Sequence, residues 1–216
     1  MSDIDNTFDI KNAWQVRQRD MILKPFFYDR YFPDRYRFLD NNDPTQRYVD
    51  TLVETPGGQK TVEEKIVHWP TDGTTGYTAF ALETWTCTVP GYERQGWMYT
   101  SVADILIYAF STPKSEVGLN VYVMDMQALK KWFWETGEEM WPITRTNERN
   151  RTECRVVPVN DVIGGGVKTK RYLIGPGWPD SNFCEVCCRD ASWGYGVSLL
   201  KGKPGRWFCR EHRPQP

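Results

Sequence analysis

Two short-spaced pairs of potential metal ligands lie in the C-terminal part of the sequence. Cys184 and Cys187 form a Cys-x-x-Cys pair, and Cys209 and His212 form a Cys-x-x-His pair after 21 intervening residues. Each pair can occupy two corners of a tetrahedral zinc ion, and the loop between them returns the second pair to the first. Because four protein ligands leave no open position, we expect a structural Zn²⁺ site. Cys188 could replace Cys187, but the spacing favours Cys187.

Disulfides and reduced core cysteines are the alternatives to zinc for these residues. Disulfides are typical of secreted chains, whereas the acidic start Met1–Asp5 is followed by no apolar run and predicts no signal peptide. The longest apolar stretch, around Ala103–Phe110, is far shorter than the roughly 20 residues that cross a bilayer. We therefore expect a cytoplasmic protein without a membrane partner.

A predicted β-hairpin carries a second set of reactive side chains. Thr55–Gln59 has the residue types of a tight turn, Gln46–Glu54 precedes it as a strand, and Lys60–Trp69 follows it as the return strand. If the two glycines form the centre of the turn, Asp50 lies opposite Lys65 in the hairpin.

Because side chains alternate between the faces of a strand, Asp50, Glu63 and Lys65 are predicted on one face. Glu63 would then lie diagonal to Asp50, about 7–8 Å away, and a metal ion can bind between two carboxylates at that separation. Glu64 points to the other face. An Asp, a Glu and a Lys on adjacent strands more often form an exposed salt-bridge ladder, and this alternative stays open.

The pattern along the chain predicts the elements that position these residues. Strands with helices before and after them are typical of an α+β fold, here a mixed β-sheet flanked by helices. The aromatic and arginine-rich segment Lys24–Phe38 either covers this sheet or stacks on a nucleic acid. The expected elements besides the hairpin are a helix over Phe8–Met21, strands over Tyr77–Thr88, Val102–Phe110 and Leu119–Met124, and a helix over Met126–Thr136 capped by Asp125 and ended by Gly137.

The charge distribution supports a division into a core over 1–150, a connecting segment over 151–178 and a zinc module over 179–216. Residues 1–150 carry 16 basic and 22 acidic side chains, whereas 151–216 carry 11 basic and 6 acidic ones. The basic C-terminal part is expected to contact a polyanion. Its candidate contacts are Lys201, Lys203, Arg206 and Arg210. Non-specific DNA contact and a purely structural role of the module both remain open.

The hairpin residues resemble the PD-(D/E)xK nuclease superfamily. The motif places an acidic residue on one strand and Glu-x-Lys on the next, here Asp50 and Glu63-Glu64-Lys65. The similarity covers about residues 10–136, because the strand over Ala103–Tyr108 and the strand-to-helix junction over Val121–Leu129 follow in the same order.

One departure from the family pattern concerns the residue before the aspartate, where Val49 replaces the usual proline. The ending Cys209–Pro214 makes the chain similar to small bacteriophage-encoded proteins that join such a core to a zinc-binding end. The resemblance therefore implies a restriction-endonuclease-like core with a small C-terminal zinc module.

The resemblance further implies Mg²⁺- or Mn²⁺-dependent hydrolysis of DNA. Asp50, Glu63 and the backbone carbonyl of Glu64 would bind the metal ion. Lys65 would orient the attacking water or stabilise the oxyanion. Three residues are candidates for a further acidic ligand: Asp9, Asp20 and Glu83.

Two other classes of function stay open. The chain could be a non-catalytic phage regulator or anti-defence protein that binds nucleic acid or a host protein on a degenerate nuclease-like scaffold, or a zinc-stabilised assembly protein. The nuclease hypothesis is compatible with a homodimer, since such enzymes often cut both strands of DNA as dimers. His68 is more often a packed surface residue than a ligand, and Asp104 needs a partner if it is buried.

Overall fold

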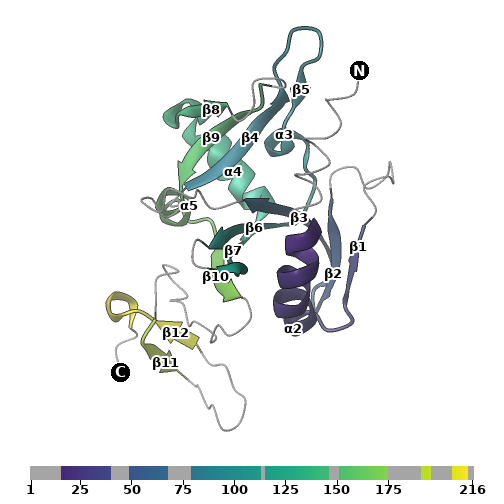
Figure 1. Ribbon diagram of the computed structural model, residues 1–216. Coiled ribbons are helices and arrows are strands. Elements are labelled where there is room, and N and C mark those ends of the chain that lie inside the picture. Colours follow the sequence, from purple (N-terminus) through teal and green to yellow (C-terminus); the bar gives the residue numbers. More distant parts are fainter. Residues whose placement is uncertain are drawn as a thin grey trace.

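The computed structural model describes residues 16–39, 49–67, 79–112, 115–145, 151–174, 191–195 and 206–213 of the 216-residue chain (Figure 1). Its main sheet has six strands in the order β1, β2, β3, β6, β7 and β10. Their bounds are Tyr36–Phe38 (β1), Thr51–Thr55 (β2), Gly58–Val67 (β3), Ile105–Thr112 (β6), Ser115–Asp125 (β7) and Thr169–Ile174 (β10). β3 and β6 are parallel and the other neighbours are antiparallel, so the sheet is mixed.

A second sheet and the helices complete the α+β fold, which confirms the expected class. This sheet has the order β5, β4, β9 and β8, with bounds Arg94–Gln95 (β5), Ala79–Cys87 (β4), Glu153–Pro158 (β9) and Ile143–Arg145 (β8). The helices among these strands are α3 (Trp97–Thr100), α4 (Met126–Thr136), the 3₁₀ turn η3 (Glu138–Met140) and α5 (Val159–Gly164). In the described part of the chain, no helix is both long and apolar enough to cross a membrane.

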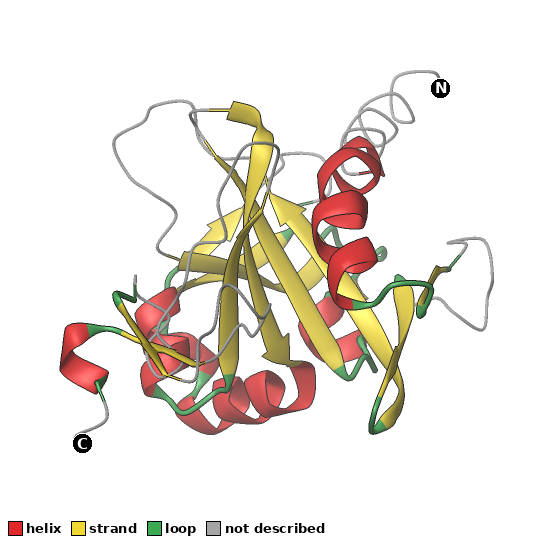
Figure 2. Cartoon of the chain, turned by 90° about the horizontal axis from the view of Figure 1, so that it is seen from below, coloured by secondary structure: helices red, strands yellow, loops and turns green. Residues whose placement is uncertain are grey.

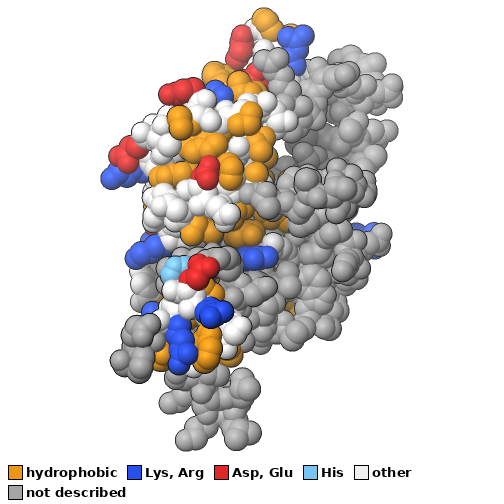
Figure 3. All heavy atoms as spheres, turned by 90° about the vertical axis from the view of Figure 1, so that its left-hand side faces the viewer, with side chains coloured by type: hydrophobic (Ala, Val, Ile, Leu, Met, Phe, Trp, Pro, Cys, Tyr) orange, Lys and Arg blue, Asp and Glu red, His pale blue; other side chains and the backbone are white. Residues whose placement is uncertain are grey.

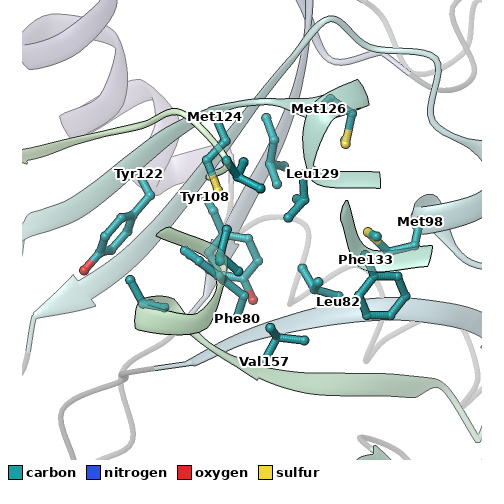
Figure 4. Packing of buried hydrophobic residues seen from close by; sticks show 14 of the residues in the cluster. Phe80, Leu82, Met98, Tyr108, Tyr122, Met124, Met126, Leu129, Phe133 and Val157 are labelled. Atoms are coloured by element: carbon teal, nitrogen blue, oxygen red, sulfur yellow. The ribbon is translucent and has the colours of Figure 1, made fainter. Parts of the chain in front are cut away.

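The main sheet is covered on both faces because its central strands bury both sets of alternating side chains. Leu106 and Tyr108 of β6 belong to one hydrophobic cluster, which includes side chains of α4 and the second sheet (Figure 4). Ile107 and Ala109 belong to another, which includes side chains of the N-terminal helix. Figure 2 shows helices on opposite sides of the strands.

The N-terminal helix is described from Val16, and it continues past the predicted end at Met21 through the π-helical segment η1 (Arg19–Tyr28) and the short α2 (Asp29–Tyr31). Pro25 lies inside η1 and has no backbone N–H to donate, so the regular α-helical bonding is interrupted there. Phe27 and Tyr28 are buried. The segment thus covers the sheet, and these two rings are not free to stack on a nucleic acid.

The hairpin forms as predicted, but with a different register. Thr55 pairs with Gly58, so the turn residues are Pro56 and Gly57 rather than the two glycines. Proline suits the first corner of such a turn because its φ is fixed, and Gly58 then adopts a φ of 100°. The ladder ends at the pair Thr51 and Val62. The prediction that Asp50 lies opposite Lys65 is therefore wrong, and the next position along the ladder places Asp50 opposite Glu63.

The helix α4 has the bounds that the sequence predicts. Its N-cap residue Asp125 accepts a hydrogen bond from the backbone N–H of Ala128 at 2.8 Å, and Gly137 follows its last residue with a φ of 92°. This confirms a capping interaction that depends only on neighbouring residues.

The segment 151–178 contributes more to the core than the expected connector would. Its described part, 151–174, forms β9, α5 and β10, which pair with strands of both sheets. β9 ends at Pro158, and α5 begins at the next residue, Val159. The division into residues 1–150 and 151–178 thus cuts through both sheets.

Candidate functional site

The end of the β2–β3 ladder brings together two of the predicted site residues. Asp50 lies directly before β2, where its backbone N–H donates to the carbonyl of Val62 at 2.8 Å. Its carboxylate Oδ2 accepts the backbone N–H of Glu64 at 2.6 Å. Glu63 lies on β3, one residue past the last paired position. The register shift of two residues leaves both carboxylates on the predicted face, because a strand repeats every two residues.

Glu63 is buried with 5% of its surface exposed, and both of its carboxylate oxygens have partners. Oε1 accepts the Lys65 Nζ at 2.5 Å, and Oε2 accepts the Ser101 hydroxyl at 3.3 Å. The Lys65 ammonium lies 5.7 Å from the centre of the Trp97 ring. Glu63 and Lys65 therefore form a half-buried ion pair beside the Trp97 ring, rather than part of an exposed salt-bridge ladder.

Burial and neighbouring charges shift the pKa values of this pair in the same direction. Burial raises the pKa of Glu63, and the Asp50 carboxylate adds to this, although the Lys65 ammonium opposes both. Burial alone would lower the pKa of Lys65, but the carboxylates of Glu63, Asp50 and Glu83 outweigh it and raise that pKa. Lys65 is accordingly a cation at neutral pH, so it can stabilise negative charge and does not serve as a base.

Ser101, Trp97 and Lys130 also lie at this site, although no sequence motif points to them. The loop after α3 carries Ser101, and the Lys130 Nζ of α4 donates to the carbonyl oxygens of Ser101 at 2.8 Å and Tyr99 at 3.2 Å. Burial lowers the pKa of Lys130, against the opposing effect of the Glu63 carboxylate. Since these residues lie 34 to 67 positions from Glu63 along the chain, only tertiary structure reveals their proximity.

Glu64 occupies the opposite face of β3, as predicted. Its Oε1 accepts the hydroxyl groups of Tyr28 and Thr51, the latter at 2.6 Å. Burial and the Asp50 charge raise the pKa of Glu64 to about 7, while these two hydroxyl groups oppose the shift. Its backbone carbonyl stays a predicted metal ligand.

The candidates for a further acidic ligand differ in their positions. The carboxylate of Glu83 lies close enough to raise the pKa of Lys65, and it accepts the Thr86 hydroxyl at 2.7 Å. Asp20 is exposed and lies 3.7 Å from the Arg19 guanidinium. Asp9 and His68 lie outside the described residues. Glu83 is thus the candidate that the structure relates electrostatically to the site.

Asp104 has structural partners at the start of β6. Its Oδ2 accepts the backbone N–H of Thr61 at 2.9 Å and the hydroxyl of the same residue at 3.0 Å, and Oδ1 lies 3.2 Å from the Lys60 Nζ. The Thr61 N–H is the main reason why the pKa of Asp104 is lowered. These contacts join β3 to the segment that leads into β6, so Asp104 has a structural role there.

Half of the predicted zinc site lies in the described part of the C-terminal module. β11 (Trp193–Tyr195) pairs with β12 (Arg206–Phe208), and the 3₁₀ turn η5 (Arg210–His212) follows. The Cys209 Sγ lies 3.3 Å from the His212 Nδ1. Two such ligands on one tetrahedral Zn²⁺ would lie about 3.6 Å apart, given the usual Zn–S and Zn–N distances. Cys209 and His212 therefore fit two corners of one zinc ion.

The other predicted residues of the module are only partly described. The remaining candidate zinc ligands and two of the candidate DNA contacts lie outside the described residues, namely Cys184, Cys187, Cys188, Lys201 and Lys203. Arg206 and Arg210 are exposed. Figure 3 shows Lys and Arg side chains near the histidine on the lower part of one face of the molecule, where the C-terminal module lies.

A divalent cation fits the donor set of Asp50 and Glu63. Their proximity already raises the pKa of Glu63, so a positive charge between them would be favourable. Among the described residues, no three or more His, Cys, Asp or Glu side chains are grouped so as to hold a metal ion. Two carboxylates nevertheless suffice for Mg²⁺, which usually keeps several waters and binds substrate phosphate.

Comparisons with protein-family models, with curated proteins and with solved structures give no match to this chain. The proposed class of the protein therefore rests on the arrangement of Asp50, Glu63 and Lys65 and on the sheet that carries them.

Proposed function

We propose that this chain is a metal-dependent nuclease that hydrolyses phosphodiester bonds of DNA, with a structural zinc site in its C-terminal module. One observation carries the proposal: Asp50 and Glu63 meet at the end of one strand pair, and Lys65 lies 2.5 Å from Glu63. The similarity to bacteriophage-encoded proteins further suggests that the enzyme acts in the cytoplasm of a host cell.

Asp50 and Glu63 would hold the Mg²⁺ or Mn²⁺ ion in this proposal. When bound, the ion lowers the pKa of a water molecule and neutralises charge on the scissile phosphate. Asp50 already uses Oδ2 for the Glu64 N–H, so Oδ1 is the oxygen assigned to the cation. Glu63 must exchange its Lys65 contact for the cation, while Ser101 keeps the other oxygen in place.

Lys65 would then be available to the substrate. Its ammonium group has three hydrogen-bond donors, and the neighbouring Trp97 ring limits the positions that this group can take. The water oxygen bonds to phosphorus and gives up its proton to solvent, while one P–O ester bond breaks and the leaving oxygen takes up a proton from solvent. Negative charge grows on the phosphoryl oxygens during this step. A cation held at that place stabilises the transition state more than the ground state.

The test is cleavage of plasmid, linear duplex and single-stranded DNA with Mg²⁺ or Mn²⁺. We expect Asp50→Asn, Glu63→Gln and Lys65→Ala each to lower the cleavage rate at least about 100-fold, which is the usual cost of removing a transition-state contact. Glu54→Gln and Lys131→Ala are matched controls, because these residues are exposed and should leave the rate unchanged.

Two results would contradict the proposal. Cleavage that survives all three site substitutions would arise from another enzyme or another site. DNA binding without any cleavage by the wild-type chain would instead support the non-catalytic binder, for which the Glu63–Lys65 ion pair would be a structural remnant.

The zinc site is tested by metal analysis of the protein after purification without chelators. We expect one Zn²⁺ per chain, and Cys209→Ser and His212→Ala should each lower that content. Cys87→Ser is the control, because Cys87 is a buried cysteine of β4. A zinc-free wild-type chain would contradict the assignment.

A further inference from the structure

Glu64 connects the two faces of the main sheet. Its backbone N–H donates to the Asp50 Oδ2 at 2.6 Å, at the edge of the proposed metal site. Its side chain extends to the opposite face, where Oε1 accepts the hydroxyl groups of Tyr28 and Thr51. One residue therefore contacts both a proposed metal ligand and the N-terminal helix.

We propose that Glu64 is a positioning residue, whose side chain is fixed by Tyr28 and Thr51 so that its backbone N–H holds the Asp50 carboxylate in the orientation that binds the cation. This inference rests on the proposed function, because it assigns Asp50 as a metal ligand. It adds a residue whose side chain never reaches the metal.

The Glu64 N–H is available to the Asp50 side chain because Asp50 lies at the end of the strand pairing. The ladder between β2 and β3 ends at Thr51 and Val62, so the Glu64 N–H lies beyond the last paired residues. The Asp50 side chain takes this N–H as a charge-assisted hydrogen bond, which fixes Oδ2 and directs Oδ1. A carboxylate held in this way loses less side-chain entropy when a cation binds.

Tyr28 and Glu64 depend on each other for their hydrogen bonds. Tyr28 is fully buried, and its ring packs 5.0 Å from that of Tyr36 and 5.3 Å from that of Phe38. A buried hydroxyl without an acceptor is costly, so the packing of the helix favours the Glu64 side chain in one position. Thr51 adds a second donor from the neighbouring strand, which restrains Oε1 from two directions.

Calorimetric titration of the full-length, zinc-loaded chain with Mn²⁺ tests the proposal without measuring catalysis. Asp50→Asn defines which part of the binding belongs to this site. We expect Glu64→Ala to raise the Kd for Mn²⁺ about tenfold or more, as the loss of an outer contact to a ligand usually does. Glu64→Gln keeps an acceptor oxygen for both hydroxyl groups and should restore binding to within about threefold.

Tyr28→Phe provides a milder variant, in case Glu64→Ala does not fold. It removes one hydroxyl group, and we expect the Kd to rise by about threefold to tenfold. The matched controls are Tyr36→Phe, whose hydroxyl bonds Asp29 in the same aromatic cluster, and Glu54→Ala on the same hairpin. Both controls should bind Mn²⁺ like the wild type.

The outcomes separate this inference from the proposed function. Wild-type binding that Asp50→Asn abolishes but Glu64→Ala and Tyr28→Phe leave unchanged would refute the positioning role alone. If Asp50→Asn leaves Mn²⁺ binding unchanged or the wild type binds none, Asp50 is not a metal ligand and both proposals fail. A loss of binding in Glu64→Ala that Glu64→Gln does not restore would likewise contradict positioning by the acceptor oxygen.

Discussion

Glu63 and Lys65 neutralise each other inside the folded chain before any cation binds. Removing one member would leave the other as a half-buried charge without its partner, which costs several kcal/mol as a rule. The Ser101 hydroxyl holds the second oxygen of Glu63, so the carboxylate keeps its place when Lys65 moves. At the scale of single residues, this arrangement supports the proposal that a metal cation takes the place of the Lys65 ammonium beside Glu63.

Asp104 allows a prediction about pH. Its folded-state pKa is lowered, chiefly by the Thr61 N–H, so its contribution to stability is present above its unfolded pKa of about 4 and is lost as the pH falls through the folded value. We expect Asp104→Asn to lower the free energy of unfolding at pH 7 by about 1 kcal/mol, a modest value because the side chain is partly exposed to solvent.

Urea unfolding of both proteins between pH 3 and pH 7 measures this difference, which should shrink below about pH 4. Asp20→Asn is the matched control, since Asp20 is exposed and pairs only loosely with Arg19 at 3.7 Å. A difference that stays constant over the whole pH range would show that the Asp104 charge does not contribute.

At the scale of elements, the contact between α5 and α4 depends on a glycine. Gly165 directly follows α5, and a Cβ at this position would overlap the indole of Trp132 in α4. Gly165→Ala must displace Trp132, so we expect it to lower the free energy of unfolding by about 1–3 kcal/mol. Gly164→Ala is the matched control, because a Cβ there meets open space. Equal stabilities of the two variants in urea would contradict this packing.

The elements that the sequence predicts well are those whose determinants are local. The α4 helix begins and ends as expected because Asp125 and Gly137 act within one turn of their own positions. The prediction of which side chains share a face of the hairpin is also correct, because the alternation of side chains along a strand does not depend on the turn residues. The predicted register of the hairpin is wrong, because the choice between Pro56 and the glycines as turn residues depends on detailed backbone geometry.

The parts of the site that the sequence does not predict are non-local. β3 pairs with β6 across an intervening segment that contains two strands of the second sheet, β4 and β5, and Ser101 reaches Glu63 through that crossover. The pairing of β9 and β10 with earlier strands is equally distant along the chain. No periodicity encodes such contacts, so Asp50, Glu63 and Lys65 could be predicted, whereas Trp97, Ser101 and Lys130 could not.

At the scale of the whole molecule, the charge asymmetry predicts how DNA binding should respond to salt. If the basic C-terminal module contacts phosphates, replacing one contact should make the logarithmic salt dependence of the binding constant shallower by about 0.9 for duplex DNA. We expect this for Arg210→Ala, an exposed residue of the module, and no change for Arg94→Ala in the acidic core. Fluorescence anisotropy at several salt concentrations measures both slopes, and an unchanged slope for Arg210→Ala would exclude this phosphate contact.

The alternation of side chains between the two faces of β3 also limits how this chain can change in length over evolution. Deleting or inserting one residue within the strand before Glu63 would exchange the faces, so that Glu63 would lie under the N-terminal helix and Glu64 would face Ser101. A change of two residues would shift the pairing yet keep each carboxylate on its side. Descendants of this sequence can therefore accept length changes inside the strand in even steps, while odd ones must be absorbed in the turn at Pro56 and Gly57.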